Sequence, residues 1–172
     1  PYTTLFRSGF LLSRGMESTG AHHRIALSVV NLVGGHKPRR LVLGFMIAGA
    51  LLSMWISNTA SILMLMPVAL AVLASCSDRN SLAAPLLLGL AWSCSIGGLG
   101  TPIGTPPNLI LVQVYEENTA QTISFGQWMS WGMPVVLTLL PLAWWWVTRT
   151  VPRELDIQVP AVGPWRSAER RV

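Results

Sequence analysis

The sequence has little charge. Its 172 residues include 12 basic and 7 acidic side chains, or 11% of the chain, against about 25% in an ordinary soluble domain. Three stretches of 37, 36 and 31 residues have no charge at all, namely 41–77, 80–115 and 118–148. About 20 apolar residues span a bilayer, whereas soluble helices of that length carry charge on their wet face. We therefore predict an all-α integral membrane protein that is not an enzyme and has no nucleic-acid partner.

The few cysteines and the distribution of acidic residues further limit the kinds of site that this chain can form. The two cysteines, Cys76 and Cys94, have neither CxxC spacing nor the number needed for a disulfide framework, so we interpret them as apolar side chains. The three uncharged stretches contain no carboxylate, which argues against a divalent-cation site or a proton relay within this chain. The net charge of +5 is explained by basic cytoplasmic loops more simply than by a polyanionic partner.

Two of the uncharged stretches are interrupted near their middle. A straight helix over 41–77 would be about 55 Å long, while the hydrocarbon core of a bilayer is about 30 Å thick. Ser57-Asn58-Thr59 divides this stretch into two shorter apolar halves, and the Gly-, Thr- and Pro-rich run 97–108 divides the next stretch. The pattern predicts a helical hairpin over 41–77 and an interrupted transmembrane helix over 80–115.

The distribution of charge predicts an orientation. Basic residues occur at 36–40, 78–79 and 149–153, and none lies between Arg79 and Arg149, where Glu116 and Glu117 are found. The positive-inside rule places the basic segments in the cytoplasm and the two glutamates outside. The hairpin is then re-entrant, 80–115 crosses outward, and 118–149 contains an interfacial segment and a returning transmembrane helix. The tryptophans of 144–146 suit an interfacial anchor.

The two ends of the chain carry weaker signals. Residues 1–8 resemble a translated sequencing adapter, so we expect native sequence to begin near Gly9. Over 9–40 we expect the end of a scaffold helix followed by an interfacial amphipathic helix. The proline-containing, charged segment 150–172 is expected to form a cytoplasmic linker or tail.

The two interruptions predict a shared binding cavity. Irregular backbone at membrane depth is tolerated only where protein or a wet cavity satisfies its polar groups. Ser57, Asn58 and Thr59 are good cap residues for a helix beginning near Ala60, and Thr105 could cap a second helix. Two helix N-termini would then favour an anion, while the free carbonyls of the preceding half-helices would favour a small cation.

The available ligands indicate how such a site would work. Ser53 and Ser57 lie one turn apart, and the Asn58 side chain adds a neutral oxygen. Glycines at 97, 98 and 100 let the second backbone approach closely. No lysine or arginine lies near either interruption, so a bound anion must be balanced by helix ends and co-bound cations. This combination favours cation-coupled anion transport, and the closed hairpin tip argues against a channel.

These residues resemble a known family. The segments Leu52–Ala60 and Ser95–Asn108 are similar to the N-terminal half of divalent anion:sodium symporters, which are the dicarboxylate and citrate carriers. The similarity covers roughly 9–149. It implies one inverted-repeat half of a homodimeric, elevator-type transporter of the cytoplasmic membrane. The second Ser-Asn-Thr hairpin of the family is not in the sequence, so the resemblance implies an incomplete fragment with half a binding site.

The resemblance also assigns roles to individual residues. It implies a sodium site formed by the backbone oxygens of Ser53, Ser57 and Gly100 with the Asn58 side chain. It implies substrate contacts from Asn58 and Thr59, with Thr101 and Pro102 nearby. Further residues would shape the second loop: Gly97, Gly98, Thr105, Pro106, Pro107 and Asn108.

The expected function is sodium-coupled transport of a C4-dicarboxylate such as succinate, with no organic cofactor. Two alternatives use the same framework, namely a carrier of sulfate-like inorganic anions and an anion exchanger that uses no sodium. An alternative of another class is a non-transporting membrane scaffold in which the broken helices serve packing alone.

Overall fold

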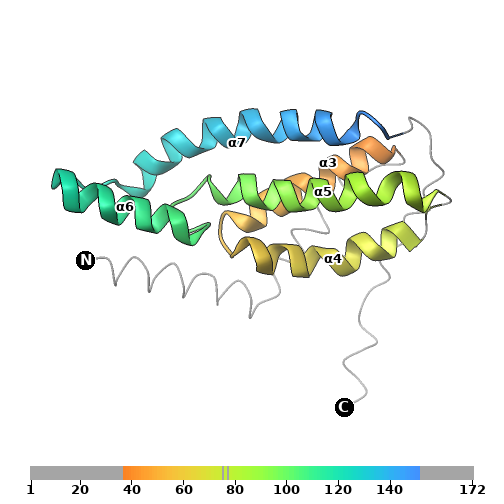
Figure 1. Cartoon of the computed structure of the whole chain (residues 1–172), viewed down its shortest axis with the longest axis horizontal. Helices are drawn as coiled ribbons and strands as arrows, with labels where there is room; N and C mark the ends of the chain where they lie inside the picture. The colour runs from red at the N-terminus through yellow and green to blue at the C-terminus, as the bar shows by residue number, and fades with distance from the viewer. Residues whose placement is uncertain (1–36, 75, 77, 152–172) are drawn as a thin grey trace, which may run out of the picture.

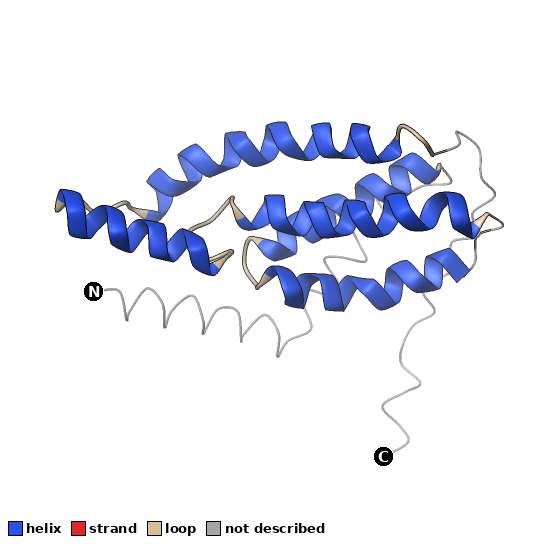
Figure 2. Cartoon of the chain, in the orientation of Figure 1, coloured by secondary structure: helices blue, strands red, loops and turns tan. Residues whose placement is uncertain are grey.

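The computed structural model describes residues 37–74, 76 and 78–151. The expectations for 1–8, 9–36 and 152–172 therefore lie outside the described residues. The described part is built from α-helices joined by short loops (Figure 2), which confirms the all-α prediction for this region. The helices are α3 (Pro38–Ser53), α4 (Asn58–Ala74), α5 (Arg79–Gly98), α6 (Pro106–Thr119) and α7 (Phe125–Thr148).

Local sequence explains where several helices begin. Pro38 occupies the first turn of α3, where its missing N–H has no consequence. The Asp78 carboxylate accepts a hydrogen bond from Ser81 N at 3.3 Å and caps α5. Ser124 caps α7 in the same way, because its hydroxyl accepts from Gln127 N at 3.2 Å. These side chains satisfy backbone donors that have no partner within a first helical turn.

A helical hairpin and α5 form the centre of the structure. Helices α3 and α4 are joined by the turn 54–57 and run in opposite directions, and α5 packs most extensively against α3 (Figure 1). Their shared core consists of fully buried apolar side chains: Leu41, Phe45, Leu52, Leu65, Leu73, Leu82, Leu86 and Leu90. Small residues bring the helix axes together, since a Cβ atom on Gly97 would collide with the backbone of Ala50.

The hairpin turn and the end of α5 lie at the same end of this three-helix unit. In Figure 1 the turn 54–57 and the loop 99–105 both face the start of α6. Within the described residues, α6 has no extended packing contact with another helix, whereas α7 returns along α5 and α3. The structure contains a helical hairpin, α3–α4, and two helices, α5 and α6, separated by the loop 99–105. That the hairpin is re-entrant and that α5 and α6 form one interrupted transmembrane helix stay predictions.

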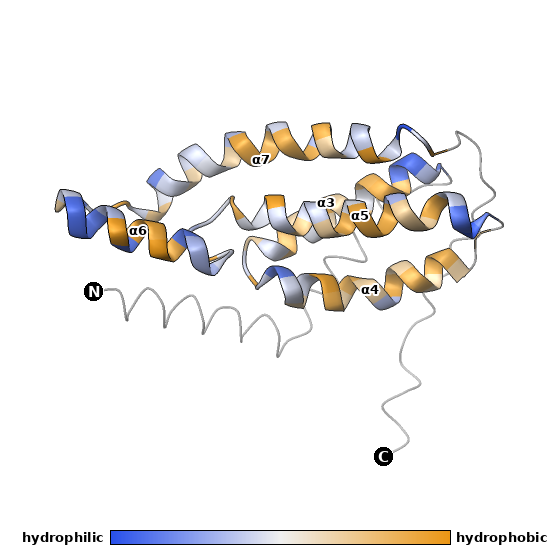
Figure 3. Cartoon of the chain, viewed as in Figure 1, coloured by the Kyte–Doolittle hydropathy of each residue, from blue (hydrophilic) through white to orange (hydrophobic). Residues whose placement is uncertain are grey.

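The charged residues of the described structure lie at its two ends, and Figure 3 shows hydrophobic segments along the helices between them. The basic end, defined by residues 37–40, 78–79 and 149, lies where α3 and α5 begin and α7 ends. There Arg39 donates to Val151 O at 3.1 Å, and Trp144 Nε1 donates to Arg39 O at 2.9 Å. Trp144 is therefore half-buried against α3, while Trp146 is exposed beneath the Arg149 guanidinium, which lies 3.7 Å from its ring centre.

Two of the described helices, α5 and α7, are long and apolar enough to cross a membrane. Much of α6 and α7 presents large apolar side chains to the outside, including Ile110, Leu111, Leu137 and Leu142. In water such a surface would be unfavourable, but lipid or further protein covers it at no such cost. This surface agrees with the predicted membrane location.

Candidate functional site

The hairpin turn presents the start of α4. The Ser57 hydroxyl accepts from Ala60 N at 3.3 Å, and the Ser57 carbonyl accepts from Ser61 N at 3.0 Å. Ser57 is thus the cap, and α4 begins at Asn58, two residues before the predicted start near Ala60. The N–H groups of Asn58 and Thr59 have no hydrogen-bond acceptor among the described residues. They are the free donors that a bound anion would use.

The start of α6 differs from this arrangement. Thr105 occupies the cap position, but its side chain makes no capping hydrogen bond. Pro106 and Pro107 have no N–H to donate, and the next donor, Asn108 N, is bonded to Thr105 O at 3.1 Å. Thr105 is thus the cap residue of α6, as predicted, but its side chain makes no capping hydrogen bond, because Asn108 N donates to Thr105 O instead. The first turn of α6 can offer an anion its dipole but no free N–H from these three residues.

Asn108 and Thr101 hold the loop between α5 and α6. The Asn108 amide donates to Gly98 O at 2.8 Å and to Thr101 O at 2.9 Å. The Thr101 hydroxyl in turn donates to Met54 O in the hairpin turn. Thr101 is fully buried and Asn108 is only 5% exposed, so these bonds are shielded from water. They join the two interruptions into one unit.

The predicted substrate residues of this loop lie inside that unit. Pro102 is buried, and the hydroxyl of Thr101 is engaged with the hairpin turn. Thr59, by contrast, is exposed at the start of α4, and Asn58 is partly exposed. Asn58 and Thr59 are thus accessible to a ligand in this conformation, while Thr101 and Pro102 support the loop from within.

Ser53 and Asn58 meet in an oxygen-rich cluster. The Ser53 hydroxyl lies 2.6 Å from Cys94 O and also within hydrogen-bond distance of Asn58 Oδ1. It carries one proton for these two acceptors. Gly98 lies directly beside them, since a Cβ atom there would be 2.6 Å from Asn58 Oδ1. Neutral oxygens that outnumber their donors suit a small monovalent cation.

The backbone carbonyls near this cluster divide into free and occupied groups. Ser53 O and Gly100 O accept no hydrogen bond from any described residue. Ser57 O already accepts from the backbone and the hydroxyl of Ser61. Gly100 lies on the side of the loop that faces α7, because its carbonyl oxygen would be 3.3 Å from a Cβ atom on Gly132. Of the oxygens that the resemblance assigns to sodium, those of Ser53 and Gly100 are therefore available.

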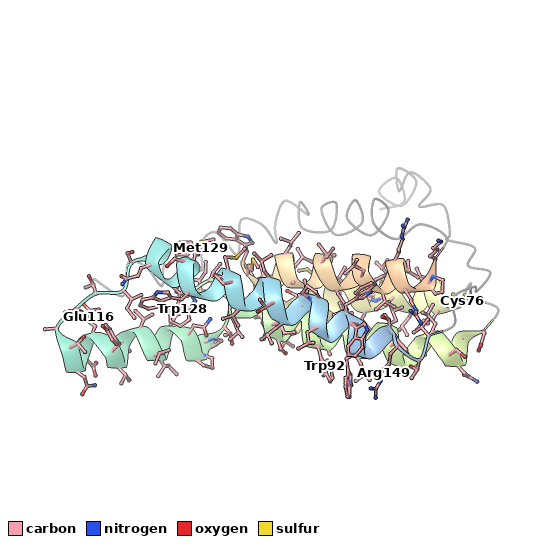
Figure 4. The ribbon with its side chains drawn as sticks, turned by 90° about the horizontal axis from the view of Figure 1, so that it is seen from above. Cys76, Trp92, Glu116, Trp128, Met129 and Arg149 are labelled. Carbon is pink, nitrogen blue, oxygen red and sulfur yellow. The ribbon has the colours of Figure 1, made fainter. Side chains whose placement is uncertain are left out.

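Two further residues of the site come from α7. Trp128 Nε1 donates to Leu99 O at 3.0 Å, and in Figure 4 the Trp128 side chain lies between α7 and α6. Gly132, one turn further along, lets the α7 backbone contact the same loop. Neither residue carries a local sequence signal for this role, because their partners lie about 30 positions earlier in the chain.

The surroundings of the site are uncharged. Among the described residues, no group of three or more histidine, cysteine or acidic side chains could hold a metal ion. The helix segments that meet at the site carry no charged side chain from 41 to 74 or from 80 to 115. Any ion bound here would interact with dipoles and neutral oxygens in surroundings of low dielectric constant.

Comparison with known proteins agrees with this chemistry. The family model described as "Citrate transporter" matches residues 1–170. The sodium-dependent dicarboxylate transporter SdcS of Staphylococcus aureus is 38% identical over 150 residues, in strain NCTC 8325 and equally in strain COL. The match covers 81% of this chain and 29% of the relative. The chain thus spans less than a third of the length of these curated relatives.

Proposed function

Because the chain belongs to the citrate transporter family, a family of membrane transporters and not of enzymes, we propose that it supplies one half of the binding site of a sodium-coupled dicarboxylate carrier. The observation that carries this proposal is the uncharged junction at which the hairpin turn and the α5–α6 loop are joined. The Ser53–Asn58 cluster and the free Ser53 carbonyl lie next to the start of α4, and Gly100, which has the second free carbonyl, lies beside the Met54 side chain of the hairpin turn. One junction thus offers ligands for a cation and for an anion.

Sodium would bind between the hairpin turn and the α5–α6 loop. The Asn58 side-chain oxygen and the free carbonyls of Ser53 and Gly100 are its proposed ligands. Ser57 O, which accepts from both the backbone and the hydroxyl of Ser61, would join the set only by releasing one of these bonds. The absence of a carboxylate favours a monovalent over a divalent cation. A bound Na⁺ would also supply the positive charge that this part of the chain lacks.

One carboxylate of the substrate would bind at the start of α4. The N–H groups of Asn58 and Thr59 remain free within the described structure, in a first turn whose cap, the Ser57 hydroxyl, accepts only from Ala60 N, and the helix dipole there favours negative charge. Sodium a short distance away would strengthen anion binding, and by reciprocity the anion would strengthen sodium binding. A C4-dicarboxylate such as succinate has a second carboxylate, which would need ligands outside this chain.

The larger assembly follows from the family. We propose a complete carrier in the cytoplasmic membrane that is homodimeric and contains a second, inverted repeat. In it, this unit moves relative to a scaffold in an elevator-like cycle. The apolar outer faces of α6 and α7 would contact lipid or the remaining helices.

Sodium-dependent succinate uptake by vesicles that contain the complete carrier tests the proposal. Asn58→Ala should abolish sodium-dependent uptake, because it removes an oxygen from the cluster. Asn80→Ala, an exposed asparagine at the basic end, is the matched control and should leave uptake unchanged. Uptake that ignores both sodium and Asn58 would overturn the proposal and point to an exchanger or to a non-transporting role. Sodium-dependent uptake of sulfate instead of succinate would overturn the substrate assignment.

A further inference from the structure

The carbonyls at the end of α5 need donors from elsewhere in the chain. A helix end leaves its last carbonyls without intrahelical partners, and burying them unbonded is costly. Over residues 98–101, three of the four carbonyls accept a side-chain hydrogen bond. Asn108 donates to Gly98 O and Thr101 O in buried bonds, and Trp128 Nε1 donates to Leu99 O in a bond that is exposed. Of these four carbonyls, only Gly100 O accepts no hydrogen bond from a described residue.

We infer that Trp128 is a positioning residue for the cation site: by engaging Leu99 O from α7, it orients the peptide that leads into Gly100 and leaves the Gly100 carbonyl free. The indole N–H is a donor only, so its hydrogen bond has one direction. Leu99 O and Gly100 N–H belong to one planar peptide unit, and Gly100 N donates to Gly97 O at 2.9 Å. Bonds on both sides of this unit hold the Gly100 Cα atom, from which the next peptide unit with Gly100 O begins. This inference rests on the proposed sodium site and assigns a determinant of it to α7.

Gly132 provides an independent observation for the same contact. A Cβ atom at this position would lie 2.6 Å from Leu99 O and 3.3 Å from both Cα and O of Gly100. Such spacing forces a shift, and here the neighbouring atoms are backbone, which yields less easily than a side chain. The absence of a side chain at Gly132 therefore lets α7 approach the loop closely enough for the Trp128 bond to form.

The competing interpretation is that Trp128 is an ordinary interfacial tryptophan near the start of a transmembrane helix. Such an anchor holds the helix at the membrane surface and tolerates loss of the N–H if an aromatic ring remains. Trp131 offers the comparison, because it lies on the same helix, is 54% exposed, and has no side-chain hydrogen bond to any residue that the structure describes. A positioning role requires the N–H of Trp128, whereas an anchoring role requires only its ring.

The test is the sodium dependence of succinate uptake by the complete carrier in vesicles. Trp128→Phe should raise the sodium concentration for half-maximal uptake by roughly two- to ten-fold, the range expected for losing one hydrogen bond, with the maximal rate at saturating sodium retained. Trp131→Phe should leave both values unchanged. Gly132→Ala should raise the sodium requirement in the same direction, and Gly126→Ala, where a Cβ atom meets nothing within 4 Å, should not.

The inference is overturned if Trp128→Phe leaves the sodium concentration for half-maximal uptake unchanged. It is also overturned if the only effect of the substitution is a lower maximal rate that matches a smaller amount of carrier in the membrane. The amount of carrier in each vesicle preparation is measured to separate these cases. Asn58→Ala, assayed in parallel, distinguishes the two proposals. If Asn58→Ala abolishes uptake while Trp128→Phe and Gly132→Ala behave as the wild type, only the role of α7 is wrong. If Asn58→Ala has no effect, the sodium site itself is wrong.

Discussion

Asn58 is the residue at which the two proposed ligands meet. Its side-chain oxygen belongs to the Ser53 cluster, and its backbone N–H is a free donor at the start of α4. Neighbouring glycines determine how closely the second loop approaches this residue. Gly98 faces Asn58 itself, whereas Gly97 faces the backbone of Ala50. Two adjacent glycines thus serve different purposes, one at the site and one in helix packing.

The two glycines should therefore respond differently to alanine. Gly98→Ala would place a methyl group against Asn58 Oδ1, so we expect loss of sodium-dependent uptake with carrier still present in the membrane. Gly97→Ala would press α5 away from α3 and should lower the free energy of unfolding by about 1–3 kcal/mol. Uptake assays and thermal unfolding in detergent check these outcomes. Equal stability losses in both variants would contradict the distinction.

Asp78 is a residue whose effect depends on pH. Hydrogen bonds from the Ser81 side chain and backbone hold the pKa of this carboxyl below its ordinary value. A depressed folded-state pKa contributes stability above the unfolded pKa and loses it as pH falls through the folded pKa. We expect the melting temperature to fall below about pH 4 as the cap of α5 protonates. Asp78→Asn keeps a good cap but should remove this component of the pH dependence.

At the scale of elements, the loop between α5 and α6 is held by side chains and not by regular structure. Asn108 reaches back from the first turn of α6, and Thr101 reaches across to the hairpin turn. The hairpin on one side, and α5 with its following loop on the other, thereby donate side-chain hydrogen bonds to backbone carbonyls of each other, as Ser53 does to Cys94 O and Thr101 to Met54 O. This explains how irregular backbone can persist within the predicted membrane depth.

The stability of the loop between α5 and α6 should depend most on the Asn108 side chain. Asn108→Leu would leave the buried carbonyls of Gly98 and Thr101 without side-chain donors, at a cost of about 1–3 kcal/mol for an unsatisfied group. We expect a lower free energy of unfolding in detergent. Asn118→Leu is the matched control, because that asparagine is exposed on the last turn of the same helix. A similar loss in both variants would show that Asn108 contributes no more than a surface side chain.

At the scale of the whole molecule, charge and apolar surface define an axis. Basic residues gather where α3 and α5 begin, and Glu116, labelled on α6 in Figure 4, lies with Glu117 near the end of that helix. The apolar middle of α5 and α7 separates them. This arrangement fits a cytoplasmic basic end under the positive-inside rule.

Thiol labelling in oriented membranes tests that topology. Cys76 lies in the connection before α5 at the basic end, so an impermeant maleimide should reach it from the cytoplasmic side only. Partial burial raises the pKa of its thiol, so labelling should be slow at neutral pH and quicken as pH rises. In a Cys76→Ala background, Glu117→Cys should label from the opposite side, while buried Cys94 stays unlabelled. Labelling of both positions from one side would contradict the orientation.

The sequence by itself determined the elements, because uncharged length, proline, glycine and cap residues act locally. The hairpin, the interruption at 97–108 and the returning helix all follow from such signals, as does the family. Local detail differs: α4 begins at Asn58, two residues before the expected start near Ala60, and the Thr105 side chain makes no capping hydrogen bond because Asn108 N donates to Thr105 O instead.

Only the tertiary structure decided which atoms are free and which are engaged. Hydrogen bonds between Thr101 and Met54, and between Trp128 and Leu99, join residues that are 47 and 29 positions apart. No spacing rule predicts such pairs, since they depend on how α3, α5 and α7 pack. Packing depends in turn on where glycines let backbones approach. The sequence therefore indicated where a cation and an anion could bind, and the packing determined which carbonyls and N–H groups are available to bind them.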